Sequence, residues 1–391
     1  MWRLGYPILL IGIEIISTLD LAFMEKIQMV DLGSQYQDIK SDVDQALQKV
    51  LNSSAFINGQ EVGDFSVQLS KWNQSAHVIT CANGTDGLQI ALMALDLNPG
   101  DEVIVPAFTY IATVEVIALL GLVPVFVDVD PNTFNIDVNQ IESKVSERTK
   151  VIVPVHLYGQ CADMDAINAI ANQNKLFVIE DLAQAIGSRY KDKKAGNNGH
   201  IGVTSFFPSK NLGCFGDGGA IFTNDDELAG KIKMIANHGQ SKKYYHDIVG
   251  VNSRLDTLQA AILNVKLKKL NRYIEARQRA ASYYDQHLVD VSSVVVPQRM
   301  KDTTHVFHQY TLKIPGRRDE LKSYLQNNGI PSMIYYPLII PDQQAYNHYT
   351  SESFQISKSL SETVLSLPMH THLKEETISY ICGKIKEFFH G

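Results

Sequence analysis

Short apolar runs that alternate with helical segments constrain the fold of this chain more than any other feature. Between about residues 40 and 235, runs rich in β-branched residues recur, mostly separated by segments with helical spacing such as 85–96 and 162–174. Short buried strands that alternate with helices are typical of βαβ units and of a mainly parallel sheet with helices on both faces. The sequence therefore predicts an α/β fold. The predicted strands are residues 78–81, 102–105, 123–128, 150–155, 176–180, 201–206 and 218–223.

The pattern changes near residue 254. Residues 254–285 are predicted as one long helix, because apolar residues recur there at steps of three and four. The recurring positions are Leu255, Leu258, Ile262 and Val265. Shorter strands and two helices follow, which indicates a smaller C-terminal α+β domain. We expect a large domain over residues 24–275 and a small domain over residues 276–391.

The first residues differ in composition from the rest of the chain. Residues 7–17 form an apolar run interrupted by Glu14, and this run is too short to span a bilayer, which needs about 20 apolar residues. A signal peptide fits badly too, because Asp20 and bulky residues stand where a small-residue cleavage site is expected. We expect residues 1–23 to be an upstream extension outside the fold, and a chain starting at Met24 to stay active. A weak membrane anchor is the alternative.

The charge balance excludes some classes of partner. The 391 residues include 35 Lys and Arg and 42 Asp and Glu, so the formal net charge is −7. An acidic chain without a basic block is a poor candidate for binding nucleic acid. With 45% hydrophobic and 20% charged residues, the composition is that of an ordinary globular protein rather than a disordered or multi-span membrane chain. These values suit a cytoplasmic enzyme that acts on small molecules.

The cysteines give no sign of a metal site. The chain has four cysteines, far apart and without a CxxC pair or a nearby histidine at metal-ligand spacing. A disulfide framework is also unexpected in a chain of this length. We therefore expect reduced thiols at Cys81, Cys161, Cys214 and Cys382, and no metal.

A turn after the first predicted strand has the chemistry of a phosphate site. Ligands of such sheets bind beyond the carboxyl ends of the strands, and residues 82–87 link a strand to a helix there. Gly84 and Thr85 offer backbone N–H groups, a hydroxyl and the positive end of a helix, all of which suit a phosphate. The alternative is an ordinary turn with Thr85 as the helix N-cap. No GxGxxG follows this strand and no GxxxxGK[ST] occurs anywhere, which disfavours dinucleotides and nucleoside triphosphates.

Two further strand ends carry ionisable residues. Asp181 directly follows the strand at 176–180, where its carboxylate is placed to pair with a protonated ring nitrogen; a helix N-cap is the alternative. Lys210 lies in a loop between a strand and a glycine-rich turn, where loss of solvent would favour its neutral, nucleophilic amine. A solvated surface lysine is the alternative. A phosphate-type turn, a strand-end Asp and a loop Lys, in this order, point to one site.

That order is the layout of fold-type I enzymes that use pyridoxal 5′-phosphate. At these residues the chain resembles the DegT/DnrJ/EryC1/StrS family of sugar aminotransferases, from about Val30 to His370. The resemblance covers several ordered motifs, which makes chance agreement negligible. The motifs are residues 81–88, 105–113, 180–187, 205–213, 250–261 and 366–370.

The resemblance implies a role for each residue around the cofactor ring. Lys210 would hold the cofactor as a Schiff base and then carry a proton between substrate and cofactor carbons. Asp181 would keep the pyridine nitrogen protonated, so that the ring accepts an electron pair. Gln184 would donate a hydrogen bond to the phenolate oxygen. Tyr110 would stack on the ring face, with Phe108 as the alternative aromatic.

The resemblance also implies which residues bind the phosphate. Gly84, Thr85 and Ser205 would bind it from one chain, and Asn252 would reach the phosphate of the neighbouring subunit's cofactor. The implied assembly is a homodimer with two shared active sites. The alternative for Asn252 is a plain loop asparagine.

The substrate side is implied more loosely. L-glutamate is the amino donor implied by the family, and Arg254 is placed to grip a carboxylate, unless it forms a structural ion pair with an acidic neighbour such as Asp256. His308 is a further cationic or N–H donor for an anionic sugar nucleotide. Residues 335–337 match a family segment near the sugar, which makes Tyr336 a substrate contact, although a histidine of the family pattern that follows is missing here.

The acceptor suggested by the resemblance is a nucleotide-linked oxo-sugar. Residues 157–165, 205–227 and 251–262 are most similar to relatives that aminate carbon 3 of UDP-2-acetamido-2-deoxy-3-oxo-glucuronate in O-antigen biosynthesis. A UDP- or dTDP-linked 3-oxo or 4-oxo 6-deoxyhexose is the alternative. A non-catalytic regulator that binds the cofactor and an enzyme of amino acids alone are further alternatives. Lys210 stands where dehydratases of the family have histidine, and this favours transamination.

Overall fold

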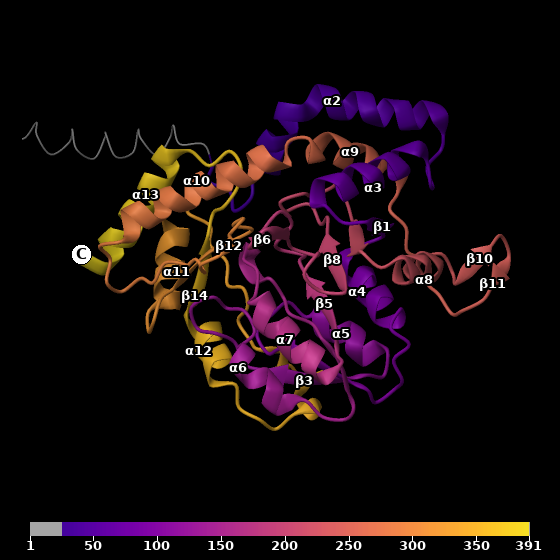
Figure 1. Ribbon diagram of the computed structural model, residues 1–391. Coiled ribbons are helices and arrows are strands. Elements are labelled where there is room, and N and C mark those ends of the chain that lie inside the picture. The colour runs from indigo at the N-terminus through magenta and orange to yellow at the C-terminus, as the bar shows by residue number, and fades with distance from the viewer. Residues whose placement is uncertain (1–25, 391) are drawn as a thin grey trace, which may run out of the picture.

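All seven predicted strands join one sheet in the computed structural model, which describes residues 26–390 (Figure 1). The extension predicted at residues 1–23 lies outside the described residues. In sheet order, the strands are β1 (His77–Cys81), β9 (Gly219–Thr223), β8 (Ile201–Ser205), β5 (Phe177–Asp181), β4 (Thr149–Ile152), β2 (Glu102–Pro106) and β3 (Val123–Val127). Strand β4 ends before the predicted residue 155, because Pro154 has no N–H to donate to a strand ladder.

Strand direction in this sheet decides where a site can form. β9 pairs antiparallel with both β1 and β8, and the remaining neighbours pair parallel, so the prediction of a mainly parallel sheet is confirmed. Cys81 and Ser205 both stand opposite Gly219, which places the carboxyl ends of β1 and β8 level with each other. Asp181 at the end of β5 pairs with Val203 of β8. The turn after β1 and the ends of β5 and β8 therefore share one edge.

Helices cover both faces of the sheet, as predicted. The side chains of β2 alternate between two apolar clusters, with Val103 and Val105 in one and Ile104 in the other. The first cluster includes helices α4 (Gly84–Met93), α5 (Ala112–Leu119) and α8 (Asp226–Ala236). The second includes α3 (Gln60–Asn73), α7 (Met164–Asn174) and α9 (Thr257–Leu267). The N-terminal helix α2 (Leu32–Ser53) packs on α9 (Figure 1).

The single helix predicted over residues 254–285 is wrong. The structure has two helices, α9 and α10 (Leu270–Leu288), separated by a turn at Lys268 and Lys269. Lys269 N donates to Lys266 O, a tighter bond than the α-helical one, so the direction changes without glycine or proline. The two helices pack against different neighbours. Helix α9 packs on α2 and α3, whereas α10 packs on α13 (Glu375–His390).

The C-terminal part has a core of its own. Strands β13 (Tyr310–Lys313) and β14 (Val364–Leu367) pair antiparallel and share an apolar cluster with α10, α11 (Arg318–Asn327) and α13. Helix α12 (Gln355–Thr363) instead contributes Leu360 to a cluster of the large sheet. The boundary expected at residues 275 and 276 falls inside α10, which runs from one part to the other, and the division into two domains stays a prediction (Figure 1).

Short elements complete the described chain. They are α6 (Val138–Ile141), strands β6 (Arg189–Tyr190), β7 (Lys193–Lys194), β10 (Gln240–Lys242), β11 (Tyr245–His246) and β12 (Thr303–Thr304), and single 3₁₀ turns at Glu142–Lys144, Leu157–Gly159, Ile340–Asp342 and Asn347–Tyr349. The β10–β11 hairpin projects at the end of the molecule remote from α11 and α13 (Figure 1). Within residues 26–390, no helix is both long and apolar enough to cross a membrane.

Candidate active site

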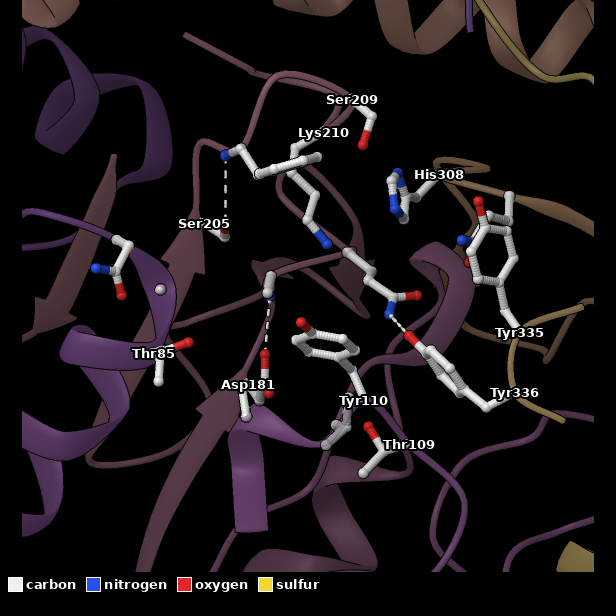
Figure 2. A pocket seen from close by; sticks show the side chains of 18 of the residues that line it. Thr85, Thr109, Tyr110, Asp181, Ser205, Ser209, Lys210, His308, Tyr335 and Tyr336 are labelled. Atoms are coloured by element: carbon white, nitrogen blue, oxygen red, sulfur yellow. Dashed lines mark hydrogen bonds between the residues drawn. The ribbon is translucent and has the colours of Figure 1, made fainter. Parts of the chain in front are cut away.

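A cavity of about 640 Å³ opens at the carboxyl edge of the sheet, a size typical of small-molecule sites. Its walls come from the turn after β1, from segments after β2, β5 and β8, and from the C-terminal part. Nine of the residues predicted from the sequence line it (Figure 2). These are Gly84, Thr85, Tyr110, Asp181, Gln184, Ser205, Lys210, His308 and Tyr336.

Asp181 is held as a buried carboxylate at the end of β5. Its Oδ2 accepts a hydrogen bond from Thr113 Oγ1 at 2.8 Å, and its Oδ1 accepts one from Ala183 N at 3.0 Å. Burial raises the pKa of Asp181 above its ordinary value, while these donors and the Lys210 cation oppose the rise. The residues after Asp181 form turns rather than a helix, so the N-cap alternative is wrong.

A second buried carboxylate, at Glu180, ties the end of β5 to neighbouring segments. Glu180 accepts hydrogen bonds from the backbone N–H groups of Gly196 and Gly199 at 2.9 and 2.7 Å, and its Oε2 lies 2.9 Å from His156 Nε2. Burial alone would raise the pKa of Glu180, but these bonds lower it below its ordinary value. His156 N donates in turn to Asp181 O at 2.9 Å. The backbone of Asp181 is therefore tied to two neighbouring segments.

Lys210 points into the middle of the cavity from the loop after β8 (Figure 2). Burial lowers the pKa of its amine to about 8, and the nearby Asp181 opposes the shift. At pH 7 about a tenth of such an amine is neutral, against less than about a thousandth of an ordinary lysine. The alternative of a solvated surface lysine is wrong, and the amine suits nucleophilic attack and proton transfer.

The phosphate-type turn has the expected shape with a different cap. Asn83, not Thr85, is the N-cap of α4, since its side chain accepts from Asp86 N at 2.8 Å. Thr85 lies in the first turn of the helix and lines the cavity. A Cβ on Gly84 would lie 2.8 Å from the Cβ of Ser205, so only glycine lets the helix start this close to β8. The side chains of Thr85 and Ser205 lie on one side of Lys210 (Figure 2). The backbone N–H groups at the start of α4 add further donors there.

The amide of Gln184 has a fixed orientation. Its Oε1 accepts from Tyr158 N at 2.8 Å, and its Nε2 donates to the hydroxyl of Tyr336 at 3.1 Å. An amide nitrogen has two hydrogens, so one remains for a ligand. The bond also ties Tyr336, from the C-terminal part, to the segment after β5.

Of the two aromatic residues considered for stacking, one is accessible. Tyr110 is 56% exposed and lines the cavity, whereas Phe108 is 1% exposed and belongs to the apolar core. The alternative that Phe108 stacks on a ligand is therefore wrong. The Tyr110 ring lies 6.0 Å from the ring of Tyr336, so the two form an aromatic wall (Figure 2).

His308 lies on the side of Lys210 away from Thr85 (Figure 2). It is 8% exposed, and its Nδ1 has no hydrogen-bond partner among the described residues. Burial, followed by the cations Lys210 and Arg277, lowers the pKa of His308 well below its ordinary value. The cationic alternative is therefore wrong, and the role of a neutral N–H donor to the substrate stays a prediction.

The structure does not bring Asn252 or Arg254 to the cavity of their own chain. Arg254 lines a second cavity of about 920 Å³ between α3, α8 and the edge strand β1. Within residues 26–390 no ion pair joins it to Asp256, so that alternative is wrong. Asn252 is exposed, and its backbone pairs with Asn237.

Several residues in or behind the cavity wall had no role in the sequence analysis. Thr113, which supports Asp181, and Ser209 belong to quoted motifs, so the motifs were a usable signal. Met29 and Val30 come from the start of the fold, where Met369 N donates to Met29 O at 3.1 Å. No local pattern marks two apolar residues as cavity wall.

Comparison with known proteins assigns the site. The sequence profile of the DegT/DnrJ/EryC1/StrS aminotransferase family matches residues 37–386. The chain belongs to this family. It is a sugar aminotransferase, and its cofactor is pyridoxal 5′-phosphate. The site fits that cofactor, because the tight glycine cradle, the buried carboxylate and the weakly basic lysine meet in one cavity.

Similar proteins cover nearly the whole chain. The "pleiotropic regulatory protein" of Geobacillus stearothermophilus is 47% identical over 93% of this chain and 98% of its own. The UDP-2-acetamido-2-deoxy-3-oxo-D-glucuronate aminotransferase of Pseudomonas aeruginosa is 46% identical over 92% of this chain and 99% of its own.

A transaminase and a solved structure from Streptomyces venezuelae extend the comparison to dTDP-linked sugars. The dTDP-3-amino-3,4,6-trideoxy-alpha-D-glucose transaminase is 36% identical over 93% of this chain and 96% of its own. The crystal structure of DesV in complex with a ketimine intermediate superposes with a TM-score of 0.91, at 36% identity over 94% of this chain and all of DesV.

Proposed function

We propose that this enzyme transfers the amino group of L-glutamate to the 3-oxo group of UDP-2-acetamido-2-deoxy-3-oxo-glucuronate. The product would serve the biosynthesis of O-antigen or another surface polysaccharide, in the cytoplasm, where the four buried thiols stay reduced. The observation that carries the aminotransferase chemistry is Lys210 beside the buried Asp181 in one cavity. The choice of sugar is supported by the relative of that name at 46% identity.

We propose one role for each of four residues that line the cavity. The cofactor, when bound, supplies an electron sink for the pair left by proton removal. Lys210 would hold the cofactor and move the proton, and Asp181 would keep the ring nitrogen protonated. Gln184, whose amide is fixed by Tyr158 N, would use its remaining N–H on the ring oxygen. Tyr110 would cover the ring.

The phosphate of the cofactor would lie against the start of α4. The N–H groups of the first turn and the hydroxyls of Thr85 and Ser205 are the donors there. Gly84 lets these groups approach closely, because a side chain would collide with Ser205. His308 and Tyr336, on the opposite side of Lys210, would then face the sugar (Figure 2).

The acceptor carries a diphosphate and a carboxylate, and one chain does not supply enough cations for both. Of the described residues that line the cavity, Lys210 is the one lysine or arginine, and His308 is neutral. We propose that Arg254 and Asn252 reach the cavity of a partner in a homodimer. Exposed apolar side chains near the second cavity and the Lys210 loop support such an interface. They are Phe56, Ile57, Val67, Phe207 and Phe215.

A substrate panel tests the proposal. The purified holoenzyme is incubated with L-glutamate and each oxo-sugar nucleotide, and 2-oxoglutarate and the amino sugar are measured by mass spectrometry. We expect turnover of the 3-oxo uronate at least about tenfold faster than of its analogue without the carboxylate, the range of one lost charged contact. Turnover of a 4-oxo-6-deoxy sugar but not of the 3-oxo uronate would overturn the sugar assignment and leave the aminotransferase standing.

A UDP- or dTDP-linked 3-oxo or 4-oxo 6-deoxyhexose is the second candidate acceptor. The apolar walls at Met29, Val30 and Leu367 favour it, because they suit a methyl group where a uronate has its carboxylate. A regulatory role, which the name of the Geobacillus relative suggests, needs no proton-transferring lysine. The same panel separates these functions, since a regulator alone would turn over none of the sugars.

A further inference from the structure

Helix α10 contains a buried arginine whose hydrogen bonds to the described residues all go to main-chain carbonyls. Arg277 is 3% exposed, and its Nη1 donates to the carbonyl oxygens of Phe307, His308 and Met369 at 3.0, 3.2 and 3.0 Å. These acceptors belong to two segments far apart in the sequence, residues 305–309 and 367–370. One guanidinium therefore joins them.

Two neighbours on the same helix reinforce the contact. Gln278 Nε2 donates to His305 O at 3.0 Å, and the Tyr284 hydroxyl donates to Pro368 O at 3.0 Å. We call Arg277, Gln278 and Tyr284 the α10 clamp. The two segments that it holds carry four lining residues of the active-site cavity. These are His308, Gln309, Leu367 and Met369.

The clamp places a positive charge inside the protein to hold two loops. Among the described residues no carboxylate pairs with Arg277, and burial alone lowers the pKa of its guanidinium to about 10. A buried cation without a counter-ion costs free energy that an apolar side chain of similar volume avoids. Packing alone thus gives no reason for an arginine. Its Nη1 lies within hydrogen-bond distance of all three carbonyls and shares its two hydrogens among them, while its buried Nε has no partner among the described residues. A single donor nitrogen therefore holds both segments at one point.

We propose that Arg277 is a positioning residue that sets the acceptor side of the active site. Its guanidinium fixes the spacing of residues 305–309 and 367–370, so that His308 and Met369 meet the sugar at the right distance from Lys210. This inference rests on the proposed transfer to a sugar. The cofactor contacts at Asp181, Gln184 and Ser205 come from other segments, and the hydrogen bonds of the clamp side chains to described residues do not go to these segments.

The test compares R277K with R279K, because Arg279 is an exposed arginine on the same helix. For R277K we expect the glutamate half-reaction, followed by its absorbance change, to stay within about twofold. KM for the accepted oxo-sugar should rise about 10- to 100-fold, the range of a displacement near 1 Å. Amide hydrogen exchange should quicken in residues 306–309 and 369–370 alone. R279K should change none of these values.

Two results would overturn the proposal. One is an equal loss in both half-reactions with a lowered Tm, which marks a merely structural arginine. The other is unchanged exchange and unchanged KM. If R277K does not fold, Tyr284→Phe removes a single clamp bond and should raise KM about two- to fivefold, the weight of one hydrogen bond. If no oxo-sugar is accepted, the proposed function fails. Hydrogen exchange then still tests whether Arg277 positions the two segments.

Discussion

Two lysines show that a perturbed amine is not by itself a reactive one. Burial lowers the pKa of both Lys210 and Lys266 to about 8. Lys266 lies in α9 with its amine 5.5 Å from the Phe215 ring and does not line the active-site cavity. Lys210 differs in facing a cavity that also contains Asp181 and a phosphate-type helix terminus. Position, rather than basicity, therefore distinguishes the reactive lysine.

The lowered pKa of Lys210 predicts how cofactor capture depends on pH. Only the neutral amine attacks an aldehyde, so the rate should rise with pH and level off above about 8 rather than above the ordinary value near 10.5. Stopped-flow absorbance of the apo-protein mixed with pyridoxal 5′-phosphate measures this. Asp181→Asn removes an anion that raises the pKa of Lys210, so its inflection should move to lower pH. An inflection near 10 in the unmodified protein would contradict the assignment.

Gly84 gives a second prediction at the residue scale. Gly84→Ala places a Cβ 2.8 Å from the Cβ of Ser205, which forces α4 away from β8 and spoils the phosphate cradle. We expect the Kd for the cofactor to rise at least about tenfold, the loss of one or two charge-assisted hydrogen bonds. Equilibrium titration by fluorescence measures it.

Gly63→Ala is the matched control, because Gly63 lies in helix α3 with no atom within 4 Å of the added Cβ. That change should leave the Kd unaltered and stabilise the protein by about 0.5–1 kcal/mol. Equal cofactor affinity in Gly84→Ala and the unmodified protein would refute the cradle.

At the scale of elements, the sequence predicts the strands of the sheet, the residues at which they end and the side chains that share a face. Alternation at Val103, Ile104 and Val105, and the strand ends at Asp181 and Ser205, follow from a pattern that is local in the chain. The break between α9 and α10 does not, because Lys268 and Lys269 keep right-handed helical or near-helical backbone angles and the apolar period continues across them. The break between α9 and α10 becomes evident only from the structure, in which the two helices have different packing partners.

The site residues also divide into those that the sequence pattern locates and those that it does not. Lys210, Asp181 and Thr85 stand at strand ends that the pattern locates, so their meeting was predictable. The α10 clamp was not, because its acceptors are main-chain carbonyls of Phe307 and Met369, which have no signature in the side-chain sequence. The neutral state of His308 depends on burial that only the assembled fold provides.

The packing of α13 on α10 gives a prediction for stability. Ile385 is fully buried in the cluster of the C-terminal part. Ile385→Ala should destabilise this part by about 2–5 kcal/mol, and Ile385→Val by about 0.5–1.5 kcal/mol, since the cost follows the volume of the cavity left behind. Thermal unfolding followed by circular dichroism measures both. Equal Tm values for the two variants would show that α13 does not share the core.

At the scale of the whole molecule, the two large cavities have complementary contents. The first contains the amine and the carboxylate of the chemistry, and the second contains Arg254 next to the exposed Asn252. Among the described residues, neither cavity of a single chain combines Lys210 with an arginine. A homodimer in which each chain completes the site of the other accounts for this separation.

Mixed dimers test that arrangement. Lys210→Ala chains are mixed with chains that carry both Asn252→Ala and Arg254→Ala, and subunits are allowed to exchange. If the sites are shared, each heterodimer has one site with no defect, so about a quarter of the wild-type activity should return. If all residues act within one chain, every site keeps a defect and no activity returns. Activity per milligram against the mixing ratio distinguishes the two results.

The central claim is that Lys210 in the active-site cavity carries the amino-transfer chemistry. The most direct measurement mixes the holoenzyme with L-glutamate alone and follows the visible absorption band and 2-oxoglutarate. We predict loss of the band and one 2-oxoglutarate per subunit for the unmodified protein and for Lys266→Met, which alters another lysine of similar pKa. Lys210→Ala should give neither signal. Production of 2-oxoglutarate by Lys210→Ala at the wild-type rate would contradict the account.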